Sequence, residues 1–340
     1  AAEGRSERPW CENRPEQASP LVESDVVSAA SPIAAATPAP AFVCPACRGD
    51  LEPSEGGARC ADCRAVYPVT DGVICFCQGD DFYEGKWVES DLSAGSLRNM
   101  LVKKERFFVN MLRGKRGSVL DLGCAGGWRF YTTVGPVVGV DLSVTSLRRA
   151  KAIYSAVARA ELRTLPFRDG SFDFVVSSDL IGHIRREEKD DALGEIHRVL
   201  KSGGWTLHYV ETEGRDPLMR FARRYPELYD RYVVRPEGHI GMESPEETFR
   251  RFRRLGFKPI KELAAYRGLT YVGRVVQYFD NEYSRLSRPI GALVSVCKML
   301  RSNRAVEAGA NIVISCLIEG GDRVLPHDWA GGVLVCYEKP

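Results

Sequence analysis

The stretch that decides the fold is "SVLDLGCAGGWRFYTTVGPVVGVDLS", residues 118–143. Two short apolar runs in it end with an aspartate, Asp121 and Asp141, and a glycine-rich turn separates them. Apolar runs of this length next to glycine predict buried strands, and the residues after the turn predict a short helix. The layout indicates two neighbouring parallel strands with a ligand-binding turn at their carboxyl ends.

Segments further along the chain continue the alternation of strands and helices. Residues 172–181 predict a strand, residues 187–204 an amphipathic helix with a glycine stop, and residues 205–211 another strand. Residues 257–268 predict a later strand, and residues 331–340 a final edge strand. Such alternation requires a parallel sheet covered by helices on both faces. The predicted fold is therefore α/β, with a Rossmann-like, seven-stranded, doubly wound sheet.

Composition and charge exclude some classes of protein. The chain has 340 residues, of which 44% are hydrophobic and 27% charged, as in globular proteins. The formal net charge of +2 gives no broad basic field, so charge alone does not imply nucleic-acid binding. No apolar run approaches the roughly 18 residues that a membrane span needs, so we expect no membrane segment.

The chain divides into three predicted parts. Residues 1–40 are rich in Ala, Pro, Ser and Glu and are predicted to be a disordered tail. Residues 41–78 predict a small metal module, and residues 79–340 the main domain. Within the main domain, stretches at about 214–240 and 270–328 exceed ordinary connections and are predicted insertions. The first insertion is rich in arginine and aromatic residues, which fits a lid over a ligand site or a helix with a solvated arginine face.

Four cysteines in two short-spaced pairs predict a zinc site. Cys44 and Cys47 form one C-x-x-C turn, and Cys60 and Cys63 form the other. Two such turns complete a tetrahedral shell of four thiolates, which is typical of structural zinc because no position stays open for water. The alternative is four free cysteines in a redox loop. Paired cysteines in a chain of this length favour a reducing, cytoplasmic compartment.

The cysteine-rich run, "CPAC…L…CADC…YPVTDGV", resembles a family of zinc ribbons. That family includes the small activator subunits of translation-factor and RNA methyltransferases. A ribbon in this position also heads some rRNA guanine methyltransferases, which usually have a histidine where this chain has Cys63. The resemblance implies a zinc ribbon at residues 41–78.

The spacing of the glycines distinguishes between two kinds of ligand-binding turn. A dinucleotide turn requires G-x-G-x-x-G, but from Gly123 this chain places Ala125 and Trp128 at the second and third positions. The spacing that fits is D-x-G-x-x-x-G, from Asp121 to Gly127. Residues 118–211 thereby resemble the class I S-adenosylmethionine-dependent methyltransferases, of the type 11-like group.

The chemistry of that cofactor agrees with the residues of the turn. S-adenosylmethionine has a sulfonium, an ammonium group and a ribose diol, and it has no phosphate. Asp121 is predicted to bind the ammonium end, and Asp141 to accept both ribose hydroxyls through its carboxylate. The glycines let the backbone approach the methionine part closely. The residues predicted to bind here also include Cys124, Ala125, Gly127 and Leu142.

Further matches to the family follow in the expected order. "ELRTLPFRDGSFDF", from Glu161, is similar to a family stretch in which an Asp usually stands first. The resemblance implies that Glu161 accepts from the adenine amino group and that the Leu162 N–H meets a ring nitrogen. Ser177 and Ser178 end the fourth strand, at the sheet edge where ligands bind in open α/β folds, and Ser177 is also predicted to contact the cofactor.

Three residues are candidates for proton removal from the methyl acceptor. Asp179 and His183 follow the fourth strand and face the expected cofactor end. His239 precedes a helix start marked by Ser244, and family members often carry Gly-His in this loop, which makes His239 the preferred candidate. His208 lies inside a strand and is predicted to be packed.

The acceptor stays open between three hypotheses. The first is in-line methyl transfer to oxygen or nitrogen of a small-molecule or glycan-like acceptor. The second is an RNA base methyltransferase whose ribbon contacts RNA, and the third is a non-catalytic scaffold. The sequence "SSDLIGH" after the fourth strand lacks an Asn/Asp-Pro-Pro-aromatic box, which argues against exocyclic amines of adenine and glutamine amides as acceptors.

Overall fold

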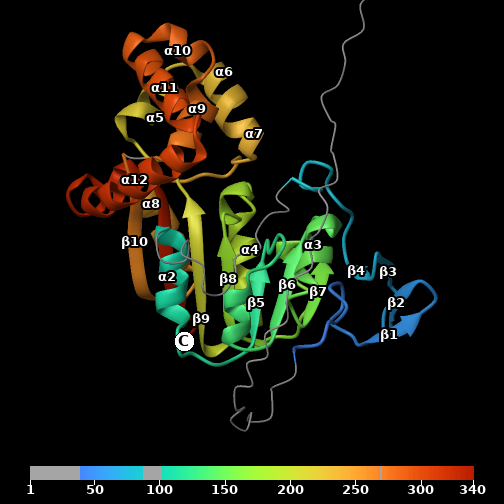
Figure 1. Ribbon diagram of the computed structural model, residues 1–340. Coiled ribbons are helices and arrows are strands. Elements are labelled where there is room, and N and C mark those ends of the chain that lie inside the picture. Colours follow the sequence, from blue (N-terminus) through green and yellow to red (C-terminus); the bar gives the residue numbers. More distant parts are fainter. Residues whose placement is uncertain (1–38, 87–101, 269) are drawn as a thin grey trace, which may run out of the picture. The chain divides into compact units, whose positions relative to one another are not determined.

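The computed structural model describes residues 39–86, 102–268 and 270–340 (Figure 1). The predicted tail at residues 1–40 lies outside these ranges, except for residues 39 and 40. Across the described ranges, none of the helices is both long and apolar enough to cross a membrane.

Seven adjacent strands form the main part of the sheet, with β10 at one edge of it. Their bounds are β5 Val119–Leu122, β6 Val137–Asp141, β7 Ala156–Arg159, β8 Phe172–Ser178, β9 Leu200–Glu211, β10 Lys258–Arg267 and β11 Ala330–Glu338. Their order is β7-β6-β5-β8-β9-β11-β10, and the first five are parallel. β11 runs antiparallel to both of its neighbours. The order is therefore that of a dinucleotide-binding sheet with one antiparallel strand inserted near the end.

The last strand was predicted at the sheet edge, and that prediction is wrong. β11 pairs with β9 on one side and with β10 on the other, so that Val333 lies between Val210 and Ala264. Every residue from Gly332 to Tyr337 is buried. A continuously buried run is typical of a strand covered on both faces, whereas a half-exposed strand alternates apolar and polar residues.

The helix before β9 also ends differently from the prediction. α4 spans Lys189–Val199, and β9 begins directly at Leu200, so the glycines do not stop the helix. Gly203 instead lies within the strand segment at a φ of 76°, a left-handed conformation that glycine adopts without a Cβ clash.

Helices cover both faces of the sheet, and the strand residues alternate between two cores. The helices are α2 Lys103–Leu112, α3 Val144–Ala150, α4 and α8 Pro245–Arg254. Val119 packs with Phe108 and Leu147 in one core, whereas its neighbour Leu120 packs with Ile196 and Phe252 in the other. This confirms a doubly wound sheet. Short 3₁₀-helices occupy Arg129–Thr133, Leu162–Thr164, Ile181–His183 and His327–Trp329.

The small N-terminal module extends the sheet. Its strands are β1 Leu51–Ser54, β2 Gly57–Cys60, β3 Val66–Thr70 and β4 Val73–Cys75. These four are antiparallel to one another, and β4 pairs parallel with β7 through Ile74 beside Ala158. The sheet therefore has eleven strands in the described residues, of which seven form the predicted core.

The two predicted insertions are helical and share a core. Their helices are α5 Pro217–Ala222, α6 Pro226–Tyr229, α7 Arg235–Glu237, α9 Val272–Phe279, α10 Glu282–Leu286, α11 Arg288–Arg301 and α12 Arg304–Val324, with a π-helical turn at Asp230–Val234. Val233 from the first insertion packs with Val275, Phe279 and Val294 from the second. Figure 1 shows these helices beyond the carboxyl ends of the strands, and we call them the helical cap.

Candidate functional site

A cavity of about 510 Å³ lies at the carboxyl ends of β5, β6, β8 and β9, below the helical cap. Open α/β sheets bind ligands at this edge, where the strand order reverses. All but one of the residues predicted to bind the cofactor line the cavity: Asp121, Gly123, Cys124, Ala125, Gly127, Asp141, Leu142, Glu161 and Leu162.

The glycine turn has a left-handed backbone at three positions. Gly123, Ala125 and Gly127 have φ angles of 62°, 45° and 83°. A Cβ at Gly127 would also lie 3.2 Å from the Tyr154 ring, so this position requires glycine for both conformation and space. Ala125 adopts the same region at a steric cost, and its N–H donates to Asp141 Oδ2 at 2.9 Å, which anchors the turn.

The Asp141 carboxylate connects the turn to the next helix. In addition to Ala125 N–H, it accepts from the Ser143 N–H at 2.9 Å through Oδ1. Burial raises the pKa of Asp141, although these backbone donors oppose the effect. Each oxygen keeps a lone pair, so the carboxylate can still accept from a diol in the cavity.

Asp121 is buried beside a tyrosine that the sequence did not reveal. The Tyr154 hydroxyl donates to Asp121 Oδ2 at 2.6 Å and accepts from the Trp128 N–H at 2.6 Å. Burial raises the pKa of Asp121 to about 7, against the lowering effect of the Tyr154 hydrogen bond. A cationic ligand group in the cavity would favour the ionised carboxylate.

Of two predicted contacts outside the glycine turn, Glu161 lines the cavity and Ser177 does not. The Glu161 carboxylate lines the cavity and is paired with Arg163, which also reaches Glu188 at 2.7 Å. Ser177 does not line the cavity, because its hydroxyl lies 2.7 Å from His208 Nδ1 in the interior. Successive strand side chains point to opposite faces, so Ser178 lines the cavity in its place.

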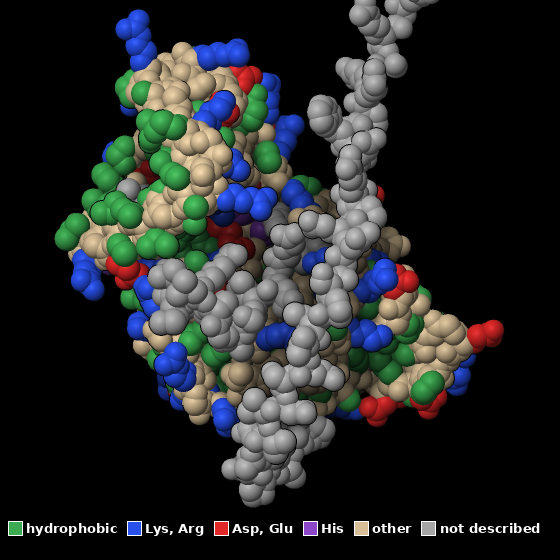
Figure 2. Space-filling view, in the orientation of Figure 1, with side chains coloured by type: hydrophobic (Ala, Val, Ile, Leu, Met, Phe, Trp, Pro, Cys, Tyr) green, Lys and Arg blue, Asp and Glu red, His purple; other side chains and the backbone are tan. Residues whose placement is uncertain are grey.

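The three candidate bases, Asp179, His183 and His239, line the cavity together. The rings of His183 and His239 are 5.0 Å apart between centroids. Burial, with a contribution from His239, lowers the pKa of His183 to about 4. Asp179 pairs with Lys104, and this charge lowers the pKa of Asp179 although its burial acts in the opposite direction. Figure 2 shows acidic and histidine side chains in the recess beside the helical cap.

Sequence reasoning missed three further charged residues in this part of the cavity. Glu211 lies with its Oε1 3.3 Å from His239 Nε2, Lys104 comes from α2, and Arg274 comes from α9. Glu211 is the last residue of a parallel strand, and an acid at that position is a signal that could have identified it. No such signal marks Lys104 or Arg274, because both reach the cavity from helices distant in sequence.

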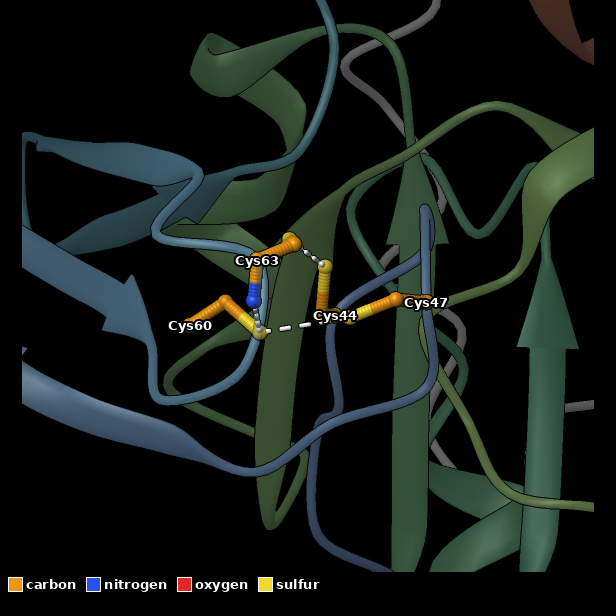
Figure 3. Close-up of side chains that lie close together, drawn as sticks. All are labelled: Cys44, Cys47, Cys60 and Cys63. Carbon is orange, nitrogen blue, oxygen red and sulfur yellow. Dashed lines mark hydrogen bonds between the residues drawn. The ribbon is translucent and has the colours of Figure 1, made fainter.

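The four cysteines of the small module converge (Figure 3). Cys44 Sγ lies 3.6 Å from Cys63 Sγ, Cys47 Sγ lies 3.4 Å from Cys60 Sγ, and all four sulfurs lie within 4.8 Å of one another. Tetrahedral zinc with Zn–S bonds of about 2.3 Å places its sulfurs about 3.8 Å apart, so the donor set fits zinc.

The module contacts a segment that follows the cavity-lining Leu162. Arg48 donates to the Leu165 carbonyl at 2.6 Å and pairs with Glu195 at 3.2 Å. Glu195 in turn accepts from the Leu165 N–H at 2.8 Å. The Val43 N–H donates to the Pro166 carbonyl at 2.9 Å. The module therefore holds the backbone just after the adenine side of the predicted cofactor site.

Comparison with known proteins agrees with this geometry. The family model described as "Methyltransferase domain" matches residues 120–208. A phosphoethanolamine N-methyltransferase of Triticum aestivum is 30% identical over 50% of this chain and 33% of its own length. A demethylmenaquinone methyltransferase of Staphylococcus aureus (strain JH9) is 31% identical over 43% of this chain and 63% of its own. The chain spans about half the length of the curated relatives it matches.

A solved structure aligns over a larger part of the chain. Phosphoethanolamine N-methyltransferase 2 of Haemonchus contortus, in complex with phosphomonomethylethanolamine and S-adenosylhomocysteine, gives a TM-score of 0.44 at 20% identity, over 70% of this chain and 53% of that one.

The chain thus carries a methyltransferase domain with a Rossmann-like sheet. The match over residues 120–208 agrees with the resemblance of residues 118–211 to the class I S-adenosylmethionine-dependent methyltransferases.

Proposed function

We propose that the protein is an S-adenosylmethionine-dependent methyltransferase acting on a small-molecule acceptor. The observation that carries the proposal is the convergence of Asp121, the left-handed glycine turn and Asp141 on one cavity at the sheet edge. Asp141 would accept from the ribose hydroxyls, Asp121 would attract the ammonium group, and Glu161 and Leu162 would border the adenine. S-adenosylmethionine supplies an activated methyl group on a sulfonium.

The residues around the histidines define the acceptor end of the cavity. Asp179, His183, Glu211 and His239 lie there under the helical cap. An acceptor held in line with the methyl group transfers its lone pair to carbon while the carbon–sulfur electrons stay on sulfur, and positioning supplies most of the rate. The protein's remaining task is to take up or disperse the acceptor's proton at this end.

Three observations favour a small molecule over RNA. The curated relatives are named for phosphoethanolamine and demethylmenaquinone, and the acceptor end is bordered by the helical cap. Of the ribbon arginines that could contact RNA, Arg48 is already paired with Glu195. Release of RNA by added salt, as in phosphate-driven binding, would support the RNA alternative instead.

We also propose that Cys44, Cys47, Cys60 and Cys63 bind one structural zinc ion. The sulfur distances support this role, as does the hydroxyl of Tyr67, which lies 3.0 Å from Cys44 Sγ and can donate to a thiolate. A shell of four thiolates leaves no position for substrate, so this ion would support the fold of the module and take no part in methyl transfer.

Calorimetry with Asp141→Ala tests the proposed function. The variant is expected to lose at least tenfold in affinity for S-adenosylmethionine, because both the diol acceptor and the anchor of the Ala125 turn are removed. Asp169→Ala, which removes an exposed carboxylate paired with Arg198, is the matched control. Unchanged affinity in the folded Asp141→Ala variant would refute the assignment.

A further inference from the structure

Three side chains at the acceptor end form a cluster with the composition of a metal site. His183 comes from the 3₁₀-helix after β8, Glu211 from the end of β9, and His239 from the loop after α7. One ligand atom from each lies within 4.8 Å of the other two. The side chains of Glu211 and His239 are almost completely buried, and all three line the cavity.

The distances fit a divalent ion with little rearrangement. Metal bonds of about 2.1 Å to nitrogen and oxygen place tetrahedral ligands about 3.4 Å apart. Glu211 Oε1 and His239 Nε2 are 3.3 Å apart. The second oxygen of Glu211, Oε2, is buried and accepts no hydrogen bond from an N–H or hydroxyl group of the described residues, and the carboxyl of Asp179 lies within hydrogen-bond reach of Glu211. Two buried carboxyl groups so close together require a shared proton or a cation beside them, and a metal ion would provide that cation.

A glycine next to the cluster permits the approach of the two histidines. Gly238 has a φ of 72°, and a Cβ built on it would lie 3.1 Å from His183 Nδ1. A side chain at this position would therefore be strained and would also press on the His183 ring. The backbone before His239 is thus compatible with two imidazoles side by side.

We propose that His183, Glu211 and His239 bind a divalent transition-metal ion, and that the methyl acceptor ligates this ion through oxygen. The proposal rests on the proposed function, because it concerns the acceptor end of the same cavity. Two imidazoles and one carboxylate suit zinc, manganese, iron or cobalt rather than magnesium or calcium, which prefer oxygen ligands. Three protein ligands leave coordination positions open, as in catalytic sites and unlike the four-thiolate shell.

The charges around the cluster indicate the class of acceptor. Two carboxyl groups, Asp179 and Glu211, line this end of the cavity together with two basic side chains, Lys104 and Arg274. A divalent ion adds two positive charges in a buried place, and an anionic oxygen ligand offsets one of them. We therefore expect an acceptor with an acidic hydroxyl, such as a hydroxy acid, an enol or a phenol.

The metal would prepare the acceptor without a dedicated protein base. A hydroxyl bound to a divalent ion loses its proton more readily, and the proton passes to solvent. The oxygen lone pair then forms the new carbon–oxygen bond, the sulfonium–methyl bond breaks with its electrons on sulfur, and the proton count balances.

The experiment is a cobalt(II) titration of the full-length protein, read by absorption and by metal content after desalting. Two bound ions per chain are expected, one with the strong thiolate charge-transfer absorption of the Cys cluster and one without it. Glu211→Gln and His239→Ala should lose the second ion, with at least tenfold weaker binding, and keep the first. His197→Ala, which removes a histidine outside the cluster, should keep both.

The outcomes separate this inference from the proposed function. If the wild-type protein binds only the thiolate-bound ion, or if Glu211→Gln binds cobalt as wild type does, the metal site is refuted. Glu211→Gln has the same shape as the native residue, and thermal melting checks that each variant folds. S-adenosylmethionine calorimetry is run in parallel: a wild-type protein that binds the cofactor but no second ion contradicts the metal site alone.

Discussion

The described part of the chain contains two clusters of side chains that could hold a metal ion, and the two are built in opposite ways. Cys44, Cys47, Cys60 and Cys63 come from two short turns within twenty residues of sequence. His183, Glu211 and His239 come from three separate elements spread over more than fifty residues. Local spacing therefore suffices for the first cluster, whereas the second exists only because the sheet brings the ends of β8 and β9 together with a loop of the cap.

The surroundings of the two clusters also differ. Two of the four cysteines are exposed, and four thiolates close a tetrahedral shell. The histidines and Glu211 instead line a cavity in which cofactor and acceptor would meet. The difference teaches that a closed cluster supports structure, while an open one next to a cavity can support chemistry.

The largest expected effect is on the cysteine cluster. Cys60→Ser should abolish zinc binding and unfold the module, because a structural zinc contributes on the order of 10–16 kcal/mol to such small domains. Zinc content and amide hydrogen exchange of residues 43–76 would measure this. Cys77→Ser removes a cysteine outside the cluster and should change neither. Retained zinc and unchanged protection from hydrogen exchange in Cys60→Ser would contradict a structural zinc ion at the cysteine cluster.

The next effect concerns the charge of the cavity. The pKa of Asp121, raised to about 7 by burial, means that the carboxylate becomes ionised as the pH rises from 6 to 8. Affinity for the cationic cofactor should rise over that range in the wild-type protein, and Asp121→Asn should bind about tenfold more weakly at pH 8. Any pH dependence of the affinity that remains in Asp121→Asn does not come from Asp121. An equal change of affinity with pH in both proteins would contradict the role assigned to Asp121.

A smaller effect tests whether contacts of the N-terminal module influence cofactor binding in the cavity. Arg48→Ala removes the hydrogen bond to the Leu165 carbonyl and the pair with Glu195. The side chain of Arg48 is 35% exposed, so its ion pair is partly screened by solvent. We therefore expect the binding free energy of S-adenosylmethionine to weaken by only about 0.5–1 kcal/mol, which calorimetry would measure as a two- to fivefold weaker affinity. Arg59→Ala, an exposed arginine of β2, is the matched control. Equal affinities in the two variants would mean that the module and the cavity are independent.

The smallest effect on the cavity is expected at Ser177. Ser177→Ala should leave cofactor affinity unchanged, because the hydroxyl bonds His208 in the interior. It should lower the free energy of unfolding in urea by about 1 kcal/mol, since a buried hydrogen bond is lost. Ser178→Ala, which changes the neighbouring serine that lines the cavity, is the variant for comparison. A weaker affinity confined to Ser177→Ala would restore the original prediction for Ser177.

The sequence predicted those parts of the site that depend on neighbours in the chain. Gly123, Gly127 and the two aspartates occupy one turn and two strand ends, so their spacing alone places them together. Tyr154, which bonds Asp121, could not be found in this way, because it reaches the turn from beyond α3. Ser177 was assigned instead of Ser178 because the sequence did not give the phase of β8 relative to the cavity.

By itself, the sequence determined the α/β alternation, the glycine turn, the aspartate pair and the cysteine spacing, because each depends on local periodicity or on short turns. Only the tertiary structure decided that β11 lies inside the sheet, that β4 joins its edge, and that Glu211 meets the two histidines. These features depend on pairing and packing between segments far apart in the chain, and the energy of such contacts does not appear in any local pattern.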